Sequence, residues 1–474
     1  MSRRLIRAAN LGLEIDRGRI TRITSPDGVS EHSLPIDDYP DGVILAPRHD
    51  HHLHPFGYAA ATRGLSLAAA TSLREVAELV TEAASRLPVG TALVGHQLDD
   101  ERLVETRLPT GSELDAVAGE RPILLHRYCG HVAVANTAAL ALAGVSSPSG
   151  ILREDEIQPV ANALLPHQPA LSEAEVASAL TELAGLGLGR VTAIISAGEP
   201  LWCSVPDEIG MLLAVAPQVP LDFEVLVIAA TPQDLELAAN RLRAGPSNVD
   251  FLGWKEFADG ALGGRTAALY QPFHDDPSNR GILRLDPIHA ADMARVCLGL
   301  GGTVAIHAIG DLANDRVLDL YEQLIEGGAD PLRLRIEHAS MLHPASVERM
   351  AQLGVTASVQ PAFITSEVGW LSKRIGERTA ITYQLGALLR TGIRVLGGSD
   401  APVESPNPWE GVASAIKGAG LTPQHAFSLF GGELEAGAPA HLLVVDRDPR
   451  LHPKPGATQV LALYRHGELA DLGG

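Results

Sequence analysis

The feature that most constrains the fold of this chain is a series of eight short apolar runs, most of them separated by helical stretches such as 291–300 and 313–325. The expected strands are Val43–Pro47, Val191–Ser196, Phe223–Ile228, Phe251–Phe257, Thr303–His307, Leu334–His338, Thr356–Gln360 and Arg394–Gly398. Strands that alternate with crossover helices form a parallel sheet, and eight of them can close into a barrel. We therefore predict an α/β chain with a (β/α)₈ TIM barrel, whose active site lies at the carboxyl ends of the strands.

The two ends of the chain differ from its middle. Short alternating stretches such as Arg19–Ile23 near the start and His441–Val445 near the end are typical of strands, and turn residues follow them. We expect residues 1–46 and 430–474 to form one small β-sandwich domain built from both termini, with the barrel spanning residues 47–429.

One connection is too long for a simple crossover. More than a hundred residues separate the first expected strand from the second, so an inserted subdomain is expected at about 60–180. Ser72 with Glu75, and Ser172 with Glu175, have the spacing of capping boxes and predict two helix starts in this region.

Chemically reactive side chains occur at or just after the ends of five of these runs. Because the carboxyl ends of barrel strands meet at one face, these residues are expected to lie close together. Imidazole, carboxylate and a modified lysine are metal ligands, so the set predicts a metal site. Its members are His52, His54, Lys255, His307, His338 and Asp400.

Alternation along a strand decides which histidines near residue 50 act together. Side chains at positions i and i+2 share a face, so His52 and His54 can bind one ion. His51 points the other way, and His49 has the same parity as His51. The alternative is an unlinked surface cluster of histidines.

Lys255 is an unusual member of a metal site, because a lysine normally titrates near a pKa of about 10.4 and its cation is repelled by a metal ion. It can face a metal if it is neutral, or if carbon dioxide converts it to a carbamate, which is an anionic ligand able to bridge two ions. The alternative is a solvated lysine on an edge strand.

A single histidine at the end of an apolar strand is more often a core residue than a ligand. His307 and His338 end two consecutive expected strands, which favours a shared role. Asp400 follows the last expected strand and has an alternative role as a helix N-cap, although Ala401 and Pro402 already supply a turn there.

The composition excludes several classes of function. The formal net charge is −20 at pH 7, which disfavours nucleic acid and anionic membrane surfaces as partners. No run is long enough to cross a membrane, and we expect no secretory signal. Cys129, Cys203 and Cys297 have no paired spacing, which suits a reducing cytoplasm.

The order of these motifs resembles that of the metal-dependent amidohydrolase superfamily, and within it the branch that includes N-substituted formamide deformylases and related N-acyl hydrolases. The similarity covers almost the whole chain. The stretches that carry it are Asp50–His54, Gly130–Leu140, Lys255–Ala268, His307–Asp311, Ile336–Ala339 and Ser399–Glu404.

The resemblance implies a role for each position. His52 and His54 would bind the more buried of two divalent ions, which are usually zinc in this family, and His307 and His338 would bind the second. Lys255, as a carbamate derived from carbon dioxide, would bridge them, and Asp400 would contact the first ion and transfer the proton. The chain departs from the family's pattern at Phe363, where a histidine is common, at Glu367, where an aspartate is common, and in a shortened segment after Trp409.

The expected function is hydrolysis of a non-peptide, amide-like C–N bond (N-acyl or N-formyl) by a metal-activated hydroxide, with Asp400 as the proton shuttle. His131 and Arg265 are candidate substrate contacts, and each could equally be structural. A single-metal deaminase, an ester or lactone hydrolase, and a relative that only binds a ligand remain alternatives. The expected partner is a small-molecule substrate, with a homo-oligomer left open.

Overall fold

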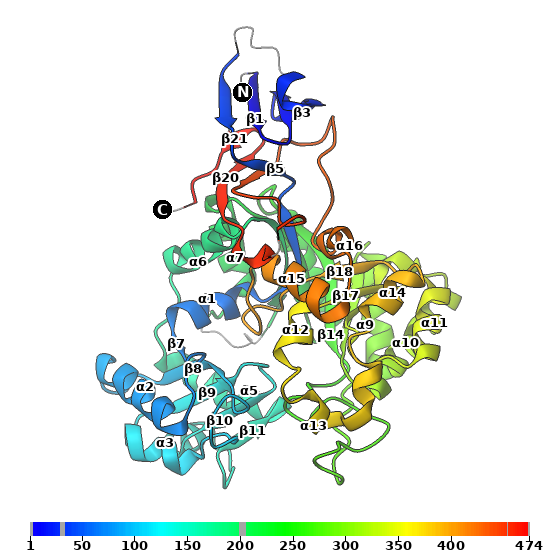
Figure 1. The fold of residues 1–474 in the computed structure, drawn as a ribbon. Helices are drawn as coiled ribbons and strands as arrows, with labels where there is room; N and C mark the ends of the chain where they lie inside the picture. Colours follow the sequence, from blue (N-terminus) through cyan, green and yellow to red (C-terminus); the bar gives the residue numbers. More distant parts are fainter. Residues whose placement is uncertain (1–2, 29–33, 199–204, 453, 473–474) are drawn as a thin grey trace.

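The expected barrel is the centre of the molecule. The structure, a computed structural model, describes residues 3–28, 34–198, 205–452 and 454–472. Eight parallel strands follow one another in chain order around the sheet (Figure 1). These strands are β6 (Arg48–Leu53), β12 (Leu188–Ser196), β13 (Asp222–Ile228), β14 (Val249–Phe257), β15 (Thr303–Ala308), β16 (Leu334–His338), β17 (Thr356–Val359) and β18 (Val395–Gly397). A parallel bridge between Leu53 and Ala401 joins the last strand to the first.

The first barrel strand was predicted in the wrong place. Val43–Leu45 forms β5, which pairs antiparallel with a strand from the C-terminal end of the chain. The barrel strand is instead the polar segment Arg48–Leu53, whose side chains are nearly all buried. A search for apolar runs misses this strand because its residues are polar. They can be buried because hydrogen bonds inside the barrel satisfy their polar groups, as with Asp50.

Helices cover the outside of the barrel. Ser172 and Glu175 form the expected capping box at the start of α6, whereas the Glu75 carboxylate accepts from Thr71 instead of Ser72. The helices after the second and later strands are α7 (Glu208–Val215), α8 (Pro232–Arg243), α9 (Pro287–Gly299), α10 (Asp311–Glu326), α11 (Pro344–Leu353), α12 (Pro361–Ser366), α13 (Leu371–Ile375), α14 (Leu385–Arg390), α15 (Pro408–Ala419) and α16 (Pro423–Ser428).

The interior of the barrel is filled in two ways. Ile194, Leu226 and Ala305 form a small apolar cluster that is separate from the main core between strands and helices. Buried polar side chains, among them Arg335 and Glu337, also belong to the barrel strands. Burying charge is costly unless it is paired, so these groups point to a constructed site rather than to a purely structural core.

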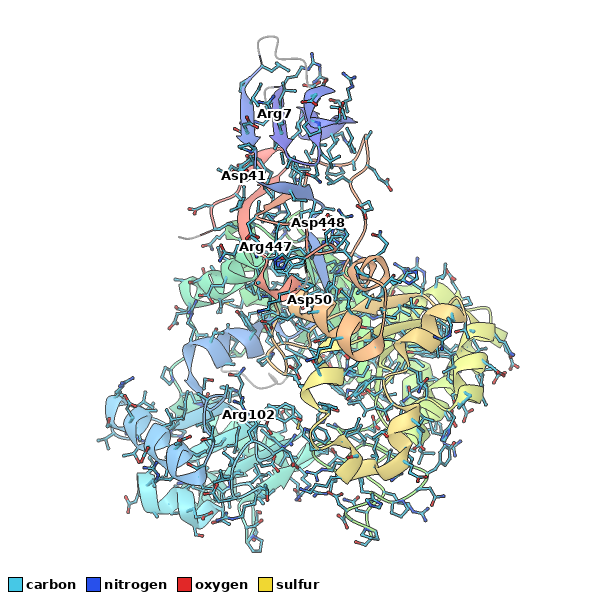
Figure 2. All side chains as sticks on the ribbon, viewed as in Figure 1. Arg7, Asp41, Asp50, Arg102, Arg447 and Asp448 are labelled. Carbon is cyan, nitrogen blue, oxygen red and sulfur yellow. The ribbon has the colours of Figure 1, made fainter. Side chains whose placement is uncertain are left out.

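Strands from the two ends of the chain pack together at one end of the molecule (Figure 1). One sheet contains β1 (Arg4–Ala8), β2 (Gly12–Asp16), β3 (Arg19–Thr24) and β4 (Ile36–Tyr39), and the other contains β5, β19 (Leu442–Val445), β20 (Val460–Arg465) and β21 (Glu468–Leu469). Ile6, Leu13, Leu442 and Tyr464 share one buried cluster between the sheets. Arg7 lies on this part of the chain, far from Asp50 in the barrel (Figure 2).

The insertion lies at the opposite end from the terminal sheets (Figure 1). Its five-stranded sheet has the order β11-β10-β9-β8-β7. The elements from the first barrel strand to the second are α1 (Pro55–Arg63), β7 (Leu65–Ser66), α2 (Leu73–Arg86), β8 (Leu93–Leu98), α3 (Gly111–Ala118), β9 (Ile123–Arg127), β10 (Val132–Ala135), α4 (Thr137–Ala143), β11 (Ile151–Arg153), α5 (Ile157–Leu164) and α6 (Glu173–Gly185).

Two further features of the chain bear on its setting. Cys129 and Cys297 are buried free thiols, and Cys203 lies outside the described residues. Across the described ranges, no helix has both the length and the apolar character needed to span a membrane.

Candidate active site

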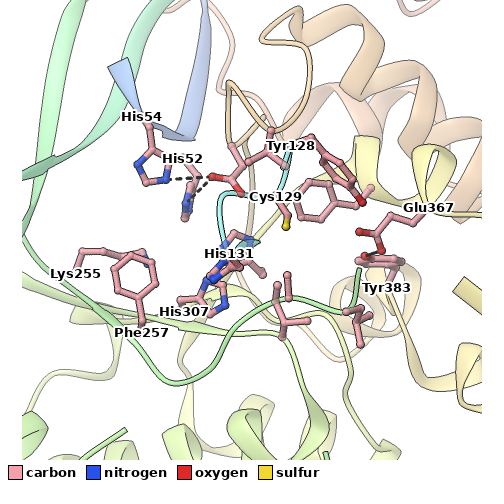
Figure 3. A pocket seen from close by; sticks show the side chains of 17 residues that line it. His52, His54, Tyr128, Cys129, His131, Lys255, Phe257, His307, Glu367 and Tyr383 are labelled. Atoms are coloured by element: carbon pink, nitrogen blue, oxygen red, sulfur yellow. Dashed lines mark hydrogen bonds and ion pairs between the residues drawn. The ribbon is translucent and has the colours of Figure 1, made fainter. Parts of the chain in front are cut away.

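The structure brings the six expected ligand residues to one cavity at the carboxyl ends of the barrel strands. His52, Lys255, His307 and His338 lie on β6, β14, β15 and β16, and Asp400 follows β18. All of them, with His54, line a small central cavity of about 30 Å³. Figure 3 shows His52, His54, Lys255 and His307 around this cavity.

His52, His54 and Asp400 form the tightest group. Asp400 Oδ1 is 3.3 Å from His52 Nε2 and 3.2 Å from His54 Nε2. Ligand atoms from these three residues all lie within 4.8 Å of one another, and this is the one such group in the described part of the chain. Burial would raise the pKa of Asp400, but the charge of His52 and the close approach of both histidine rings hold that pKa well below its usual range.

His52 is oriented by a buried carboxylate. Its Nδ1 lies 2.5 Å from Glu337 Oε2, and Arg335 donates a second hydrogen bond to the same oxygen at 3.0 Å. Burial would raise the pKa of Glu337, but Arg335 and His52 outweigh it and keep the carboxylate charged. This contact fixes Nε2 of His52 toward the cavity, as carboxylates commonly do for metal-binding histidines.

Asp50 ties the first barrel strand to the last. Its carboxylate accepts hydrogen bonds from the backbone N–H groups of His52 and Ser399, both at 3.0 Å, and from the Ser399 hydroxyl at 2.5 Å. A Cβ atom at Gly398 would lie 2.7 Å from the backbone nitrogen of His52, so only glycine allows the two backbone segments to lie this close together. The result is that His52 and Asp400 are positioned together.

His338 is held so that one ring nitrogen faces the cavity. Its Nδ1 lies 2.7 Å from Gln360 Oε1, which leaves Nε2 available. The backbone of His338 has a positive φ of 70°, and that of Asp400 has a φ of 60°. Such a conformation is costly for residues with side chains and concentrates at functional sites. Burial holds the pKa of His338 well below its usual value, so the ring is neutral and able to act as a ligand.

His307 and Lys255 are close to this group but make other contacts in this structure. His307 Nε2–H donates to the Gly260 carbonyl at 3.1 Å, while its ring centroid is 4.5 Å from that of His338. Lys255 Nζ donates to the Glu256 carbonyl at 3.3 Å and lies over the Phe257 ring. Burial lowers the pKa of Lys255 to about 8, which favours the neutral amine that reacts with carbon dioxide.

The donor set fits a divalent metal ion. Burial lowers the pKa of His54 to about 4, so its ring is neutral, as coordination requires. Asp400 Oδ1 is buried and has no well-formed hydrogen bond. Burial would lower the pKa of His52, but Asp400 and Glu337 outweigh it and raise that pKa, so His52 releases its proton when it binds a metal ion. A buried acceptor without a donor, beside these imidazoles, is the arrangement that a cation would complete.

The two candidate substrate contacts have different positions. His131 lines the cavity, and its Nδ1 lies 3.0 Å from Glu154 Oε2. Arg265 does not line this cavity and instead pairs with Asp275 at 2.9 Å.

Sequence reasoning gave no role to four residues that orient or line the site, namely Glu337, Gln360, Glu367 and Tyr383. Glu337 directly precedes His338, and its alternation with an apolar residue is the one local signal that could have marked it. The other three come from loops and short helices, whose contacts are set only in the folded chain.

With the site described, comparison with known proteins decides the family. The model of the amidohydrolase family matches residues 41–429. The chain belongs to this family. Its superfamily comprises metal-dependent hydrolases, and both the barrel and the His52–His54–Asp400 group agree with that assignment.

Individual relatives give the same result. This amidohydrolase is 31% identical to "Putative amidohydrolase YtcJ" of Bacillus subtilis over 79% of this chain and 74% of that protein. It is 26% identical to the N-substituted formamide deformylase of Arthrobacter pascens over 84% of this chain and 82% of that protein. The crystal structure of an uncharacterized metal-dependent hydrolase from Pyrococcus horikoshii superposes with a TM-score of 0.75 at 26% identity, covering 96% of this chain and 99% of that one.

Proposed function

We propose that this amidohydrolase cleaves an amide-like C–N bond outside peptides, in an N-acyl or N-formyl amine. The observation that carries the proposal is the His52–His54–Asp400 group, which combines two imidazoles with a charged carboxylate in a buried cavity. The similarity to an N-substituted formamide deformylase supports the choice of bond.

The residues divide into two ligand sets in this proposal. His52, His54 and Asp400 would hold one divalent ion, with zinc the metal that best suits imidazole and carboxylate donors. His307 and His338 would hold a second, which requires His307 to leave the Gly260 carbonyl, and Lys255 as a carbamate would be a ligand to both. Bound divalent ions supply a nucleophile from water near neutral pH and polarise the substrate carbonyl.

Asp400 carries the proton in the reaction. Its carboxylate accepts a proton from the attacking water as the new C–O bond forms, and gives it to the nitrogen as the C–N bond breaks. An amide and one water molecule thus yield a carboxylic acid and an amine. The low pKa of Asp400 keeps it ionised and ready to accept the proton.

Local geometry disfavours a deaminase. The deaminases of this superfamily have a glutamate three residues after the histidine of the fifth strand, and here that position is Gly310. A Cβ atom at Gly310 would lie 1.9 Å from the Ala268 carbonyl oxygen, so no larger side chain fits without a backbone shift.

Metal content and hydrolysis measured together test the proposal. In the wild type we expect roughly two ions per chain and turnover of N-formyl or N-acyl amines. Lys255→Ala is expected to lose one or both ions. Asp400→Asn is expected to lower kcat by about 10²-fold or more, since it removes the proton carrier.

Lys417→Ala is the matched control, because Lys417 is exposed on α15 and does not line the central cavity. It should leave metal content and turnover unchanged. A single ion that Lys255→Ala does not affect would reject the carbamate bridge, and full turnover in Asp400→Asn would reject the proton shuttle.

A further inference from the structure

The central cavity is too small to hold a whole substrate, so the parts of the substrate away from the scissile bond must lie beside it. At about 30 Å³ it has room for little more than the reacting atoms. Two larger cavities adjoin it. One, of about 480 Å³, shares His131, Lys255 and Phe257 with it, and the other, of about 450 Å³, shares Tyr128 and Val403.

The second of these neighbours, here called the acidic vestibule, is lined by Asp99, Glu101, Arg102, Tyr128, Val403 and Glu404, among others. It lies between the insertion, which contributes the segment after β8, and the loop after β18. Figure 2 labels Arg102 at the edge of the insertion that faces the barrel.

Glu367 lies on the wall of the central cavity, and the adjacent residue Ser366 lines the vestibule. It lines the central cavity and is 8% exposed, and Oε2 of its carboxylate accepts a hydrogen bond from the Tyr383 hydroxyl. Figure 3 shows Glu367 and Tyr383 on the side of the cavity away from His54 and Lys255. A carboxylate buried to this extent is normally paired with a cation.

The described residues supply no cation in direct contact with Glu367, although the charge of the buried Arg127 acts on it and lowers its pKa. Among them, neither Glu367 nor Glu404 nor Asp99 forms an ion pair with a basic side chain, while Glu101 is paired with Arg374 and Lys373. The exposed Arg102 donates to the Ala68 carbonyl at 2.8 Å. Arg127 is bonded to Asp100 at 2.6 Å and lies against the Tyr128 ring.

The carboxylates act on one another. Burial raises the pKa of Glu367 to about 8, with Glu404 and Asp99 adding to the rise. Burial also raises the pKa of Glu404 to about 7, with Asp400 and Asp99 adding to it. An anionic substrate group would be repelled here, whereas a cation would relieve the repulsion.

Aromatic rings complete the surroundings. Phe363 and Tyr383 both line the central cavity, and their ring centroids are 6.4 Å apart in an edge-to-face arrangement. Aromatic faces attract ammonium groups, most strongly where water is excluded. A buried carboxylate beside two rings therefore matches an alkylammonium ion better than a neutral polar group.

We propose that the substrate carries a protonated amino group, held by Glu367, Phe363 and Tyr383 on the wall of the central cavity beside the acidic vestibule. This inference rests on the amide hydrolysis proposed above and names the class of substrate. Glu404 and Asp99 draw the cation toward the site through their negative charge.

Binding of a small probe tests the inference without turnover. n-Butylammonium and the similarly shaped n-butanol are titrated into the metal-loaded enzyme by calorimetry at about pH 8.5, above the pKa of about 8 of Glu367. We expect the wild type to bind the ammonium ion at least about tenfold more tightly than the alcohol. Glu367→Gln, which keeps the shape of the side chain, should abolish this preference.

Two further variants serve as checks. Asp234→Asn removes a carboxylate from the other large cavity and should leave the preference unchanged. If Glu367→Gln does not fold, Glu404→Gln, at a half-exposed position, should still weaken ammonium binding by about threefold. Equal affinity of the wild type for the two probes, or an unchanged preference in Glu367→Gln and Glu404→Gln, would overturn the inference.

Turnover separates this inference from the proposed activity. Two formamides with tails of equal length, one ending in an ammonium group and one in a methyl group, are compared in the wild type. A higher kcat/KM for the ammonium formamide, lost in Glu367→Gln, supports the inference. If the two formamides are turned over equally well, the cation site is rejected and the amide hydrolase stands. If neither formamide is turned over while ammonium binding is intact, the amide hydrolase is rejected and the cation site stands.

Discussion

At the scale of single residues, the site depends on contacts that fix each side chain in one orientation. His52 and His338 each use Nδ1 to bind a buried partner, Glu337 or Gln360, and each therefore turns Nε2 toward the cavity. The two partners differ in one respect. Glu337 also pairs with Arg335, so its removal would strand a buried cation, whereas Gln360 is neutral.

Gln360→Met therefore tests orientation without leaving a charge unpaired. It removes the hydrogen bond to His338 Nδ1 while keeping the length of the side chain. We expect metal affinity to fall about 10-fold to 100-fold, as is usual when such a partner of a ligand is lost. Competition with a chelator measures this change.

The control for this prediction is Gln218→Met, at an exposed position on the barrel surface. It should leave metal affinity unchanged. If Gln360→Met and Gln218→Met bound metal equally well, Gln360 would have no part in orienting His338.

The residues of the site could be predicted from the sequence to different extents. Period-two alternation was enough to pair His52 with His54, because both lie on or just beyond one strand. Arg265 shows the limit of this approach, since its partner Asp275 lies in a loop with no regular pattern. His307 shows a second limit of prediction from the sequence, because the contact of its Nε2 with the Gly260 carbonyl depends on the path of the backbone.

At the scale of elements, seven of the eight barrel strands can be predicted from apolar runs, and the first strand, β6, cannot. Strand β6 is polar because it carries ligands and their supports, so the pattern that marks a buried strand is absent from it. The apolar run before it, β5, is needed instead by the terminal sheet. In β6, the residues needed for the site therefore replace the apolar residues by which a buried strand is recognised in a sequence.

The insertion holds an element-scale feature of its own. His96 on β8 and His126 on β9 stack with ring centroids 5.5 Å apart and an angle of 10° between the rings. Both are buried, and burial lowers the pKa of His126 to about 3. His126 Nδ1 has no hydrogen-bond partner.

This buried histidine predicts acid sensitivity. An unfolded chain binds a proton at His126 below about pH 6.5, while the folded chain does so only near pH 3. Between these values the unfolded state holds the extra proton, so the free energy of unfolding falls as the pH falls through that window. At pH 5 the loss from this residue is about 2 kcal/mol.

His126→Phe should remove that loss, since phenylalanine has a similar shape and does not titrate. Urea denaturation at pH 7 and pH 5 should show a smaller decrease in stability for this variant than for the wild type. His425→Phe, at an exposed position, should keep the wild-type decrease. An identical decrease in wild type and His126→Phe would contradict the prediction.

At the scale of the whole molecule, the two ends of the chain are joined far from the site. Tyr464 on β20 is 1% exposed, packs in the cluster shared by the two terminal sheets, and exchanges a hydrogen bond of 2.7 Å with Tyr39. Arg465, the next residue, pairs with Asp222 at the start of β13 and so connects this unit to the barrel. The cavity lies at the other ends of the barrel strands.

This separation predicts that stability and catalysis can be changed independently. Tyr464→Ala should cost about 3–5 kcal/mol, as expected for a large aromatic side chain removed from a core. Tyr464→Phe removes only the hydroxyl and should cost about 1 kcal/mol. Urea denaturation measures both losses, and kcat/KM per folded molecule should match the wild type in each variant. A fall in kcat/KM that exceeds the loss of folded protein would show instead that the terminal sheets act on the site through β13.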